Sequence, residues 1–173
     1  YDYFTYTKDW DYLESELLPY MIGVADFYEQ FICFTDTSDG AERIRIYPSV
    51  SPENTPQNFM PPEGVQMAHP MPTTVNSTID LSIVKEFFSN MKKIADEMER
   101  CGRRSPFDEA RIQRWNRILD AIPEFKVNEK GAVKEWQEDE FEDRYDHRHL
   151  SHIYPVFPGK EIYPKRNPEW TEA

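Results

Sequence analysis

Three stretches of this chain repeat apolar residues at steps of three and four, and this pattern constrains the fold more than any other feature. The clearest stretch runs from about residue 78 to residue 101. Residues 9–34 and 105–122 show the same stripe, which is typical of a helix with one buried face. The sequence therefore predicts a mainly α protein with three long helices.

Residues at the ends of these stretches fit helix boundaries. Asp9 is placed to cap the first helix, and Gly102 suits the left-handed position after the second. We expect a kink or a short break near Pro19, because a proline inside a helix removes a backbone donor. Ser105 is expected to cap the third helix, with Pro106 at its first position.

Two short β signals lie outside the helices. Residues 41–47 alternate polar and apolar side chains, as a short strand does. Residues 125–136 contain two short runs around Asn128-Glu129-Lys130-Gly131, which predicts a hairpin with a glycine-containing turn. Antiparallel helices with small β-hairpins in the loops at one end fit a piece of an all-α toroid.

Charge and hydropathy limit the partners. The 32 acidic residues exceed the 20 basic ones and give a net charge of -12. Such a surface repels phosphate backbones, so we expect no nucleic acid partner. No apolar run is as long as a membrane span, so no membrane is expected. Cys33 and Cys101 define no disulfide framework, and Cys33 is predicted to be a small buried side chain.

A proline-rich stretch, residues 46–56, separates the first two helices and cannot itself be regular structure. Its three prolines remove three backbone donors and favour extended neighbours. Glu53 is the single carboxylate within it. A stiff loop that holds one carboxylate can aim a general acid, and the alternative is a surface connection with a solvated glutamate.

The densest polar cluster is Tyr145-Asp146-His147-Arg148-His149-Leu150-Ser151-His152. His147, His149 and His152 could ligate a divalent metal, although their spacing is not a standard zinc spacing. Alternatively, Arg148 with its five donors and a neutral imidazole would suit a hydroxyl-rich ligand. A third possibility is a polar loop whose histidines cap helices or bind carboxylates.

Aromatic residues make up 14% of the chain and suit a carbohydrate site, where rings cover the apolar faces of sugars. Trp136 follows Glu135, and a tryptophan beside a carboxylate can form such a platform, although a half-buried hairpin tryptophan is also common. No glycine-rich phosphate loop and no Gly-x-Ser-x-Gly elbow is present. The sequence gives no support for nucleophilic serine or cysteine chemistry.

Several motifs occur in a particular order between about residue 9 and residue 162. They are Ser49-Val50-Ser51-Pro52-Glu53-Asn54, then Asn76-Ser77-Thr78-Ile79-Asp80, then Gly131-Ala132-Val133-Lys134-Glu135-Trp136, then His147-Arg148-His149-Leu150-Ser151-His152. Together they resemble the central part of the catalytic domain of glycoside hydrolase family 95. That family consists chiefly of α-L-fucosidases, with some α-L-galactosidases.

The resemblance implies an (α/α)6 toroid and inverting hydrolysis of a terminal α-L-fucosyl or α-L-galactosyl bond, with no cofactor and no metal. By resemblance, Glu53 is the proton donor, and Arg148 and His149 contact the sugar. The remaining substrate-binding candidates stand in the same motifs: Asn54, His152 and Trp136.

The family activates its water with asparagines of an earlier motif, supported by an aspartate of a later one, and neither motif is found in this chain. Three long helices also cannot close a ring of twelve. We therefore expect residues 1–173 to be a single segment of a catalytic domain, truncated at both ends and inactive alone. Its expected partners are a fucosylated or related oligosaccharide and the remainder of its own domain, and the compartment stays unknown.

Two alternatives stay open. The chain could be an all-α sugar-binding or scaffold module that keeps the shape of the pocket without the chemistry. It could also be a metal-dependent hydrolase built on the histidine cluster.

Overall fold

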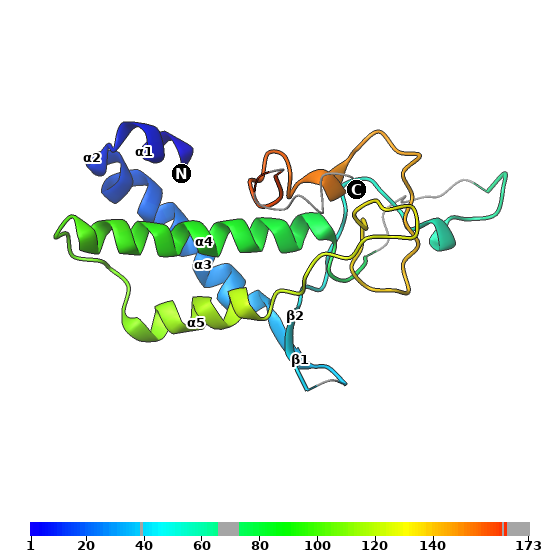
Figure 1. Cartoon of the computed structure of the whole chain (residues 1–173), viewed down its shortest axis with the longest axis horizontal. Coiled ribbons are helices and arrows are strands. Elements are labelled where there is room, and N and C mark those ends of the chain that lie inside the picture. Colours follow the sequence, from blue (N-terminus) through cyan, green and yellow to red (C-terminus); the bar gives the residue numbers. More distant parts are fainter. Residues whose placement is uncertain (39, 66–72, 164, 166–173) are drawn as a thin grey trace.

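Packed helices form one end of the molecule, and long loops form the other (Figure 1). The computed structural model describes residues 1–38, 40–65, 73–163 and 165. Helix α4 (Thr78–Arg100) runs through the middle, beside α3 (Leu18–Phe31) and above α5 (Glu109–Asp120) in Figure 1. The long helices predicted from the apolar stripes are therefore confirmed.

The first predicted helix contains a π-helical turn. Three short segments precede α3: α1 (Asp2–Thr7), α2 (Trp10–Tyr12) and the π-helical η1 (Leu13–Leu17). Asp9 caps α2 as predicted, because its Oδ1 accepts a hydrogen bond from the Tyr12 N–H at 2.9 Å. The irregularity expected near Pro19 takes the form of η1. A π turn at this point suits a residue that cannot donate a helical hydrogen bond.

The first helix ends at Phe31 rather than at residue 34, so that prediction is wrong. Ile32 is extended and leads into β1 (Cys33–Asp36), which pairs antiparallel with β2 (Glu42–Arg45). Strand β2 confirms the strand predicted within residues 41–47. The partner strand was missed because the predicted helix included Cys33 and Phe34, whose apolar side chains directly follow Phe31 and Ile32.

The placement of Cys33 corrects another prediction. Cys33 is exposed, whereas its neighbour Ile32 is buried. Successive side chains of extended backbone point to opposite faces, so the one that follows a core residue faces outward. The prediction of a buried Cys33 assumed a helix at this position and is wrong.

The boundaries of α4 and α5 follow from their caps. Gly102 follows α4 with φ +67°, the left-handed conformation predicted for it. Helix α5 begins later than predicted, because Asp108 rather than Ser105 is its N-cap. Asp108 Oδ1 accepts from the Arg111 N–H at 2.8 Å. The Ser105 hydroxyl instead accepts from the Phe107 N–H at 3.2 Å, which forms a separate turn.

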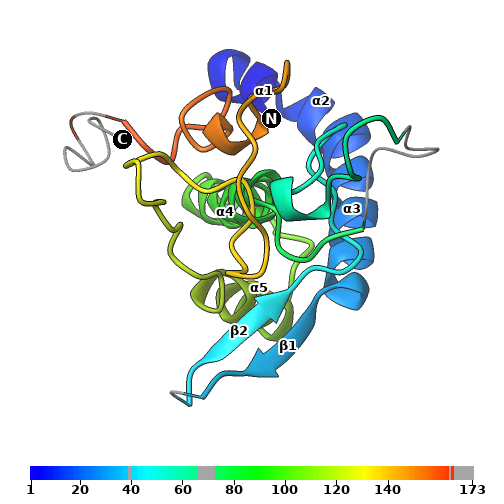
Figure 2. The same cartoon turned by 90° about the vertical axis from the view of Figure 1, so that its right-hand side faces the viewer.

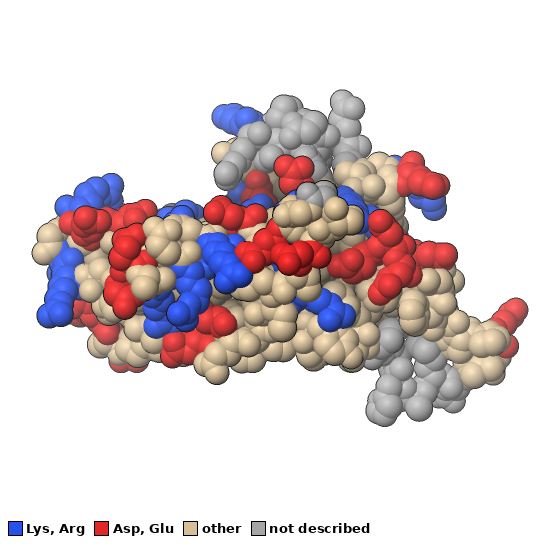
Figure 3. Space-filling model, turned by 90° about the horizontal axis from the view of Figure 1, so that it is seen from below, with Lys and Arg blue, Asp and Glu red and all other residues tan. Residues whose placement is uncertain are grey.

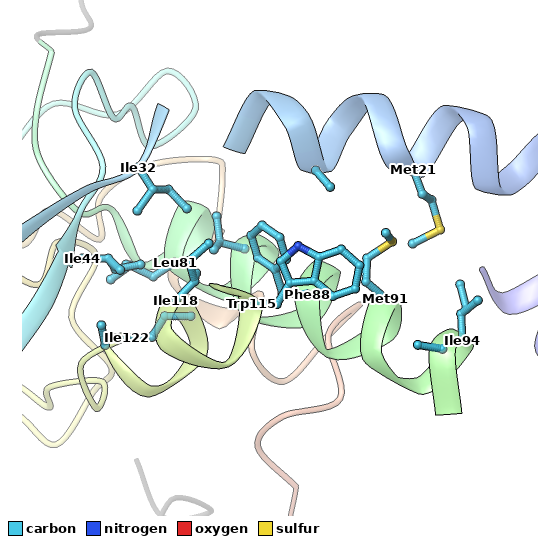
Figure 4. Packing of buried hydrophobic residues seen from close by; sticks show 14 of the residues in the cluster. Met21, Ile32, Ile44, Leu81, Phe88, Met91, Ile94, Trp115, Ile118 and Ile122 are labelled. Atoms are coloured by element: carbon cyan, nitrogen blue, oxygen red, sulfur yellow. The ribbon is translucent and has the colours of Figure 1, made fainter. Parts of the chain in front are cut away.

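The core lies where α3, α4, α5 and β2 meet (Figure 4). Phe88 and Trp115 are fully buried at its centre, and Phe107 packs edge-on against Trp115 with ring centroids 4.8 Å apart. Burial of rings this large is the main favourable contribution to such a core. Figure 4 also labels Met21, Ile32, Ile44, Leu81, Met91, Ile94, Ile118 and Ile122.

A buried carboxylate joins α3 to α5. The Glu29 side chain is 7% exposed, and its Oε1 accepts from the Trp115 indole N–H at 2.7 Å and from Arg111 Nε at 2.9 Å. Charge-assisted bonds of this kind compensate the burial of the carboxylate. Glu29 therefore has a structural role in the helical end.

Residues 125–136 form the predicted hairpin with a single β-bridge, Val127 to Val133. The Asn128 N–H donates to the Ala132 carbonyl at 2.8 Å, and Gly131 has φ +82° in the turn. The observed fold is thus mainly helical with a small two-stranded antiparallel sheet. Closure into a toroid stays a prediction.

The loops lie over one end of the helices when the molecule is viewed along α4 (Figure 2). From below, acidic and basic side chains are interspersed over the surface (Figure 3). Within the described ranges, none of the helices combines the length and the apolar character needed to cross a bilayer.

Candidate active site

The loop that carries Glu53 is fixed at its start by Ser49, which is 1% exposed. Ser49 and Thr74 exchange two backbone hydrogen bonds of 3.0 and 2.8 Å. The Ser49 hydroxyl accepts from the Ser77 N–H at 2.8 Å and donates to Asp80 Oδ2 at 2.7 Å. Because Ser77 caps α4 and Asp80 lies in its first turn, these bonds tie the loop to the N-terminal end of α4.

Glu53 has an unusual backbone conformation, with φ +54°. Few residues other than glycine adopt this left-handed region, which costs on the order of 1–3 kcal/mol. The next residue holds the bend: the Asn54 N–H donates to the Ser51 carbonyl at 3.1 Å, and Asn54 Nδ2 donates to the Arg144 carbonyl at 3.0 Å. The bend brings the Glu53 carboxylate to the segment that contains Arg148.

Further bonds join this loop to the acidic segment that precedes the histidine cluster. The Gln57 N–H donates to the Glu142 carbonyl at 3.0 Å, and Asn58 Nδ2 donates to the Glu140 carbonyl at 2.8 Å. The Glu142 N–H donates back to Asn58 Oδ1 at 3.2 Å. Two loops that lie far apart in the sequence thus run side by side. Figure 1 shows both at the same end of the molecule.

Glu53, Arg148 and His149 meet at one carboxylate oxygen. Arg148 Nη2 donates to Glu53 Oε2, and His149 Nε2 lies 3.2 Å from the same oxygen. The three side chains are 48%, 70% and 41% exposed, so the group lies at the surface and is open to a ligand. The structure therefore brings together the expected acid and both expected sugar contacts.

The other three expected contacts are buried. Asn54 is 2% exposed, and its amide is used by the Arg144 carbonyl and by the Thr55 N–H, which donates to Asn54 Oδ1 at 2.9 Å. Trp136 is 0% exposed and packs with Val75 and Phe141. Neither can cover a sugar without rearrangement, because the surrounding protein takes up their contact surface. A sugar contact by Asn54 or Trp136 stays a prediction.

His152 also differs from the expectation, since it is 9% exposed. Its Nδ1 lies 2.7 Å from Glu135 Oε2, and its ring packs against Tyr145 with centroids 4.7 Å apart. His152 therefore faces the interior beneath the surface group. It can support that group but does not contact a ligand in this arrangement.

Comparison with known proteins identifies the family. The family model described as the glycosyl hydrolase family 95 catalytic domain matches residues 1–173. The chain belongs to this family. It is also 28% identical over 173 residues to a protein named Alpha-L-fucosidase 2 from Arabidopsis thaliana. That match covers 100% of this chain and 18% of the relative, so the chain spans less than a fifth of that protein's length.

Two buried residues of this family 95 chain were missed as site residues by sequence reasoning. The Ser51 hydroxyl donates to Glu135 Oε1, and both residues are 1% exposed. Glu135 was noted only as the neighbour of Trp136. The sequence carries no clear signal for the burial of Glu135, because neighbouring side chains of extended backbone usually point to opposite faces and Trp136 is itself buried.

The three imidazoles of the cluster have separate partners. His149 Nε2 contacts Glu53, His152 Nδ1 contacts Glu135, and His147 Nδ1 accepts from the His149 N–H at 3.2 Å. Among the residues that the structure describes, no set of three histidine, cysteine or carboxylate side chains is arranged to hold a metal ion. Each imidazole of the cluster thus takes part in hydrogen bonding or ion pairing in this structure.

The half-buried Tyr145 lies in the deeper part of the site. Burial raises the pKa of Tyr145 well above its usual range, and the nearby Asp143 carboxylate raises it further. The neutral Tyr145 hydroxyl donates to the Val133 carbonyl at 2.8 Å and accepts from Asn128 Nδ2 at 3.0 Å. These bonds attach the hairpin to the segment that leads to His149.

A hollow of about 470 Å³ lies elsewhere, between α1, α4 and residues 155–161. Two of its lysines are paired with carboxylates: Lys85 contacts Glu161, and Lys160 Nζ lies 3.6 Å from Asp2 Oδ1. None of Glu53, Arg148 and His149 lines it. We therefore place the candidate active site at the exposed group and not at this hollow.

Proposed function

We propose that this chain forms the acid side of an inverting glycoside hydrolase that removes terminal α-L-fucosyl or α-L-galactosyl residues from glycans. The observation that carries this proposal is the contact of Glu53 with Arg148 and His149. Family membership and the resemblance to a protein named Alpha-L-fucosidase 2 support the same assignment. The substrate class and the stereochemistry are proposals for the whole protein.

In this mechanism Glu53 gives its proton to the glycosidic oxygen while the bond from that oxygen to the anomeric carbon breaks. A water on the opposite face attacks the anomeric carbon and loses its proton to a base, so the configuration inverts. General acid catalysis typically contributes about 10²–10⁴-fold to such a step. Arg148 and His149 bind sugar hydroxyls and orient the anomeric carbon.

In the structure, Arg148 Nη2 donates to the carboxylate of Glu53. Positive charge beside a carboxylate favours its ionised form, whereas a general acid must carry a proton. In the proposed mechanism the sugar hydroxyls take over the donors of Arg148 and His149. Glu53 Oε2 then faces the glycosidic oxygen in place of the arginine.

An inverting enzyme also needs a base about 6.5–9.5 Å from its acid. We propose that this group belongs to a part of the catalytic domain outside residues 1–173. An exposed aromatic strip on α3 supports a larger domain: Tyr20 is 71% exposed, Phe27 is 55% exposed, and Phe31 stacks on Phe27. These residues lie on one helix face, where a neighbouring helix would pack.

The test is a leaving-group comparison on the full-length protein. In Glu53→Gln, cleavage of an unactivated α-L-fucoside should fall by about 10²–10⁴-fold, because the leaving oxygen needs a proton. Cleavage of the dinitrophenyl α-L-fucoside, whose leaving group is stable as an anion, should fall much less. Equal losses on both substrates, or no loss, would remove Glu53 as the acid.

Glu63→Gln is the matched control, since Glu63 is an exposed glutamate later in the same loop region. It should leave both rates unchanged. NMR of the first-formed sugar anomer tests inversion in the same reaction. If the full-length protein binds the sugar but hydrolyses no glycoside of a panel, the sugar-binding module is the better assignment.

A further inference from the structure

We propose that Glu135 is a positioning residue. Its buried carboxylate fixes the acid loop (residues 49–54) relative to the sugar-binding loop (residues 147–152). This inference rests on the proposed function, because it defines the role of Glu135 relative to Glu53 and His149. The sequence motifs do not predict this role. The hydrogen bonds around the Glu135 carboxylate indicate it.

The carboxylate of Glu135 bridges the two loops directly. Its Oε1 accepts from the Ser51 hydroxyl, two residues before Glu53, and its Oε2 lies 2.7 Å from His152 Nδ1, three residues after His149. Glu135 and Ser51 are each 1% exposed. An ionised carboxylate only accepts hydrogen bonds, so it can take one donor from each loop at the same time.

The backbone of Glu135 is fixed without the help of its side chain. Its N–H donates to Asp143 Oδ1 at 2.8 Å, and its carbonyl accepts from the Thr78 N–H at 3.0 Å at the start of α4. A change confined to the carboxylate should therefore leave the local chain path in place. It should alter only the two bonds to Ser51 and His152.

These two bonds act on the catalytic group through short stretches of chain. Ser51 is followed by the left-handed bend at Glu53, and His152 lies in the 3₁₀ turn η3 (Ser151–Ile153) directly after the sugar-binding residues. A misplacement of about 1 Å in such a group can cost about 100-fold in rate. Loss of the bridge should therefore slow the reaction while the protein stays folded.

The decisive variant is Glu135→Gln in the full-length protein. Glutamine keeps the shape but offers one acceptor oxygen instead of two. We expect kcat on an unactivated α-L-fucoside to fall by about 10- to 100-fold, with a smaller fall on the dinitrophenyl α-L-fucoside. A purely structural role would lower the melting temperature and leave the ratio of the two rates unchanged.

Glu29→Gln is the matched control, because Glu29 is also a buried carboxylate with donors on both oxygens, but it lies in the helical end. It should lose stability and keep the rate ratio when assayed well below its melting temperature. If Glu135→Gln behaves like Glu29→Gln, the inference is overturned.

A rescue experiment tests the bridge from the other side. Asparagine can place an N–H close to the position of His152 Nδ1, whereas alanine cannot. His152→Asn should therefore stay within about threefold of the wild-type kcat, and His152→Ala should show the same loss as Glu135→Gln. Equal activity in the two variants would contradict the bridge.

Glu53→Gln is measured in parallel to separate the two proposals. If Glu53→Gln is fully active, the proposed function fails and the role of Glu135 fails with it. If Glu53→Gln shows the leaving-group effect and Glu135→Gln does not, only the positioning role fails.

Discussion

Glu53 Oε2 and His149 Nε2 lie 3.2 Å apart, although 96 positions separate the two residues in the sequence. Each residue is held by its own loop: Glu53 follows the buried Ser49 and Ser51, and His149 precedes the buried His152. The contact therefore depends on how the two loops are joined below the surface.

Removal of the Arg148 side chain should weaken substrate binding. In the full-length protein, Arg148→Ala should raise the KM for an α-L-fucoside by about 10- to 100-fold, since a hydrogen bond to a charged group contributes about 1.5–3 kcal/mol. Arg100→Ala is a suitable control, because Arg100 is 72% exposed and also contacts a glutamate, Glu97. An unchanged KM in Arg148→Ala would argue against a sugar contact there.

The isolated 173-residue chain should not hydrolyse glycosides. In the proposed mechanism the chain supplies the acid and two sugar contacts, whereas the base that an inverting enzyme needs is assigned to another part of the domain. Incubation of the purified chain with an aryl α-L-fucoside should give no release above the Glu53→Gln variant of the same chain. Rapid turnover that depends on Glu53 would show that the chain holds the base as well.

The exposed strip on α3 should be buried in the full-length protein. Phe27→Glu would then place a charge in a packed interface and should destabilise the protein by more than about 1 kcal/mol. Gln30→Glu adds the same charge to an exposed position of α3 and should have little effect. Thermal unfolding measures both, and equal melting temperatures would mean that nothing packs on Phe27.

Asn76 should matter for stability more than an exposed asparagine does. It is 5% exposed with φ +51°, its Oδ1 accepts from the Ile46 N–H at 2.8 Å, and its Nδ2 donates to Glu138 Oε1 at 2.7 Å. Asn76→Ala leaves these buried groups unpaired, which costs about 1–3 kcal/mol. Asn58→Ala, at an exposed residue that also makes side-chain bonds, should cost less in the same thermal unfolding assay.

Tyr154 should contribute to stability in a pH-dependent way. Burial raises the pKa of Tyr154 from 10.0 to about 12, and the bond of its hydroxyl to Glu86 Oε2 raises it as well. The folded state therefore binds more protons than the unfolded state between these values. Stability from Tyr154 is present below pH 10 and is lost as the pH rises toward 12. The gap in melting temperature between wild type and Tyr154→Phe should shrink across this range.

The sequence predicted the helices well because their apolar stripes are long and regular. It missed β1, since Cys33 and Phe34 directly follow the apolar end of α3 and a strand of four residues is too short to show a periodicity of its own. It also placed the cap of α5 at Ser105, because two residues with capping side chains stand close together. The structure has Asp108 as the N-cap, directly after Phe107, whose ring packs against Trp115.

The exposed residues of the candidate site were predictable from the sequence, and the buried residues beneath them were not. Glu53, Arg148 and His149 stand in motifs with an unusual density of polar residues, and those motifs resemble a known family. The roles of Asn54, Trp136 and Glu135 depend on burial, which the sequence does not show directly. A polar residue in a catalytic motif can equally contact the ligand or support the residue that does.

The side-by-side course of the two loops has a consequence for protein engineering. Hydrogen bonds join the two segments at several points, including Ser51 with Glu135 and Asn58 with Glu140. The conformation of each segment therefore depends on the other. A chimera that takes only one loop from a relative with a different sugar preference would combine surfaces that were not selected together. Recombination between family members should therefore transfer both loops as a unit.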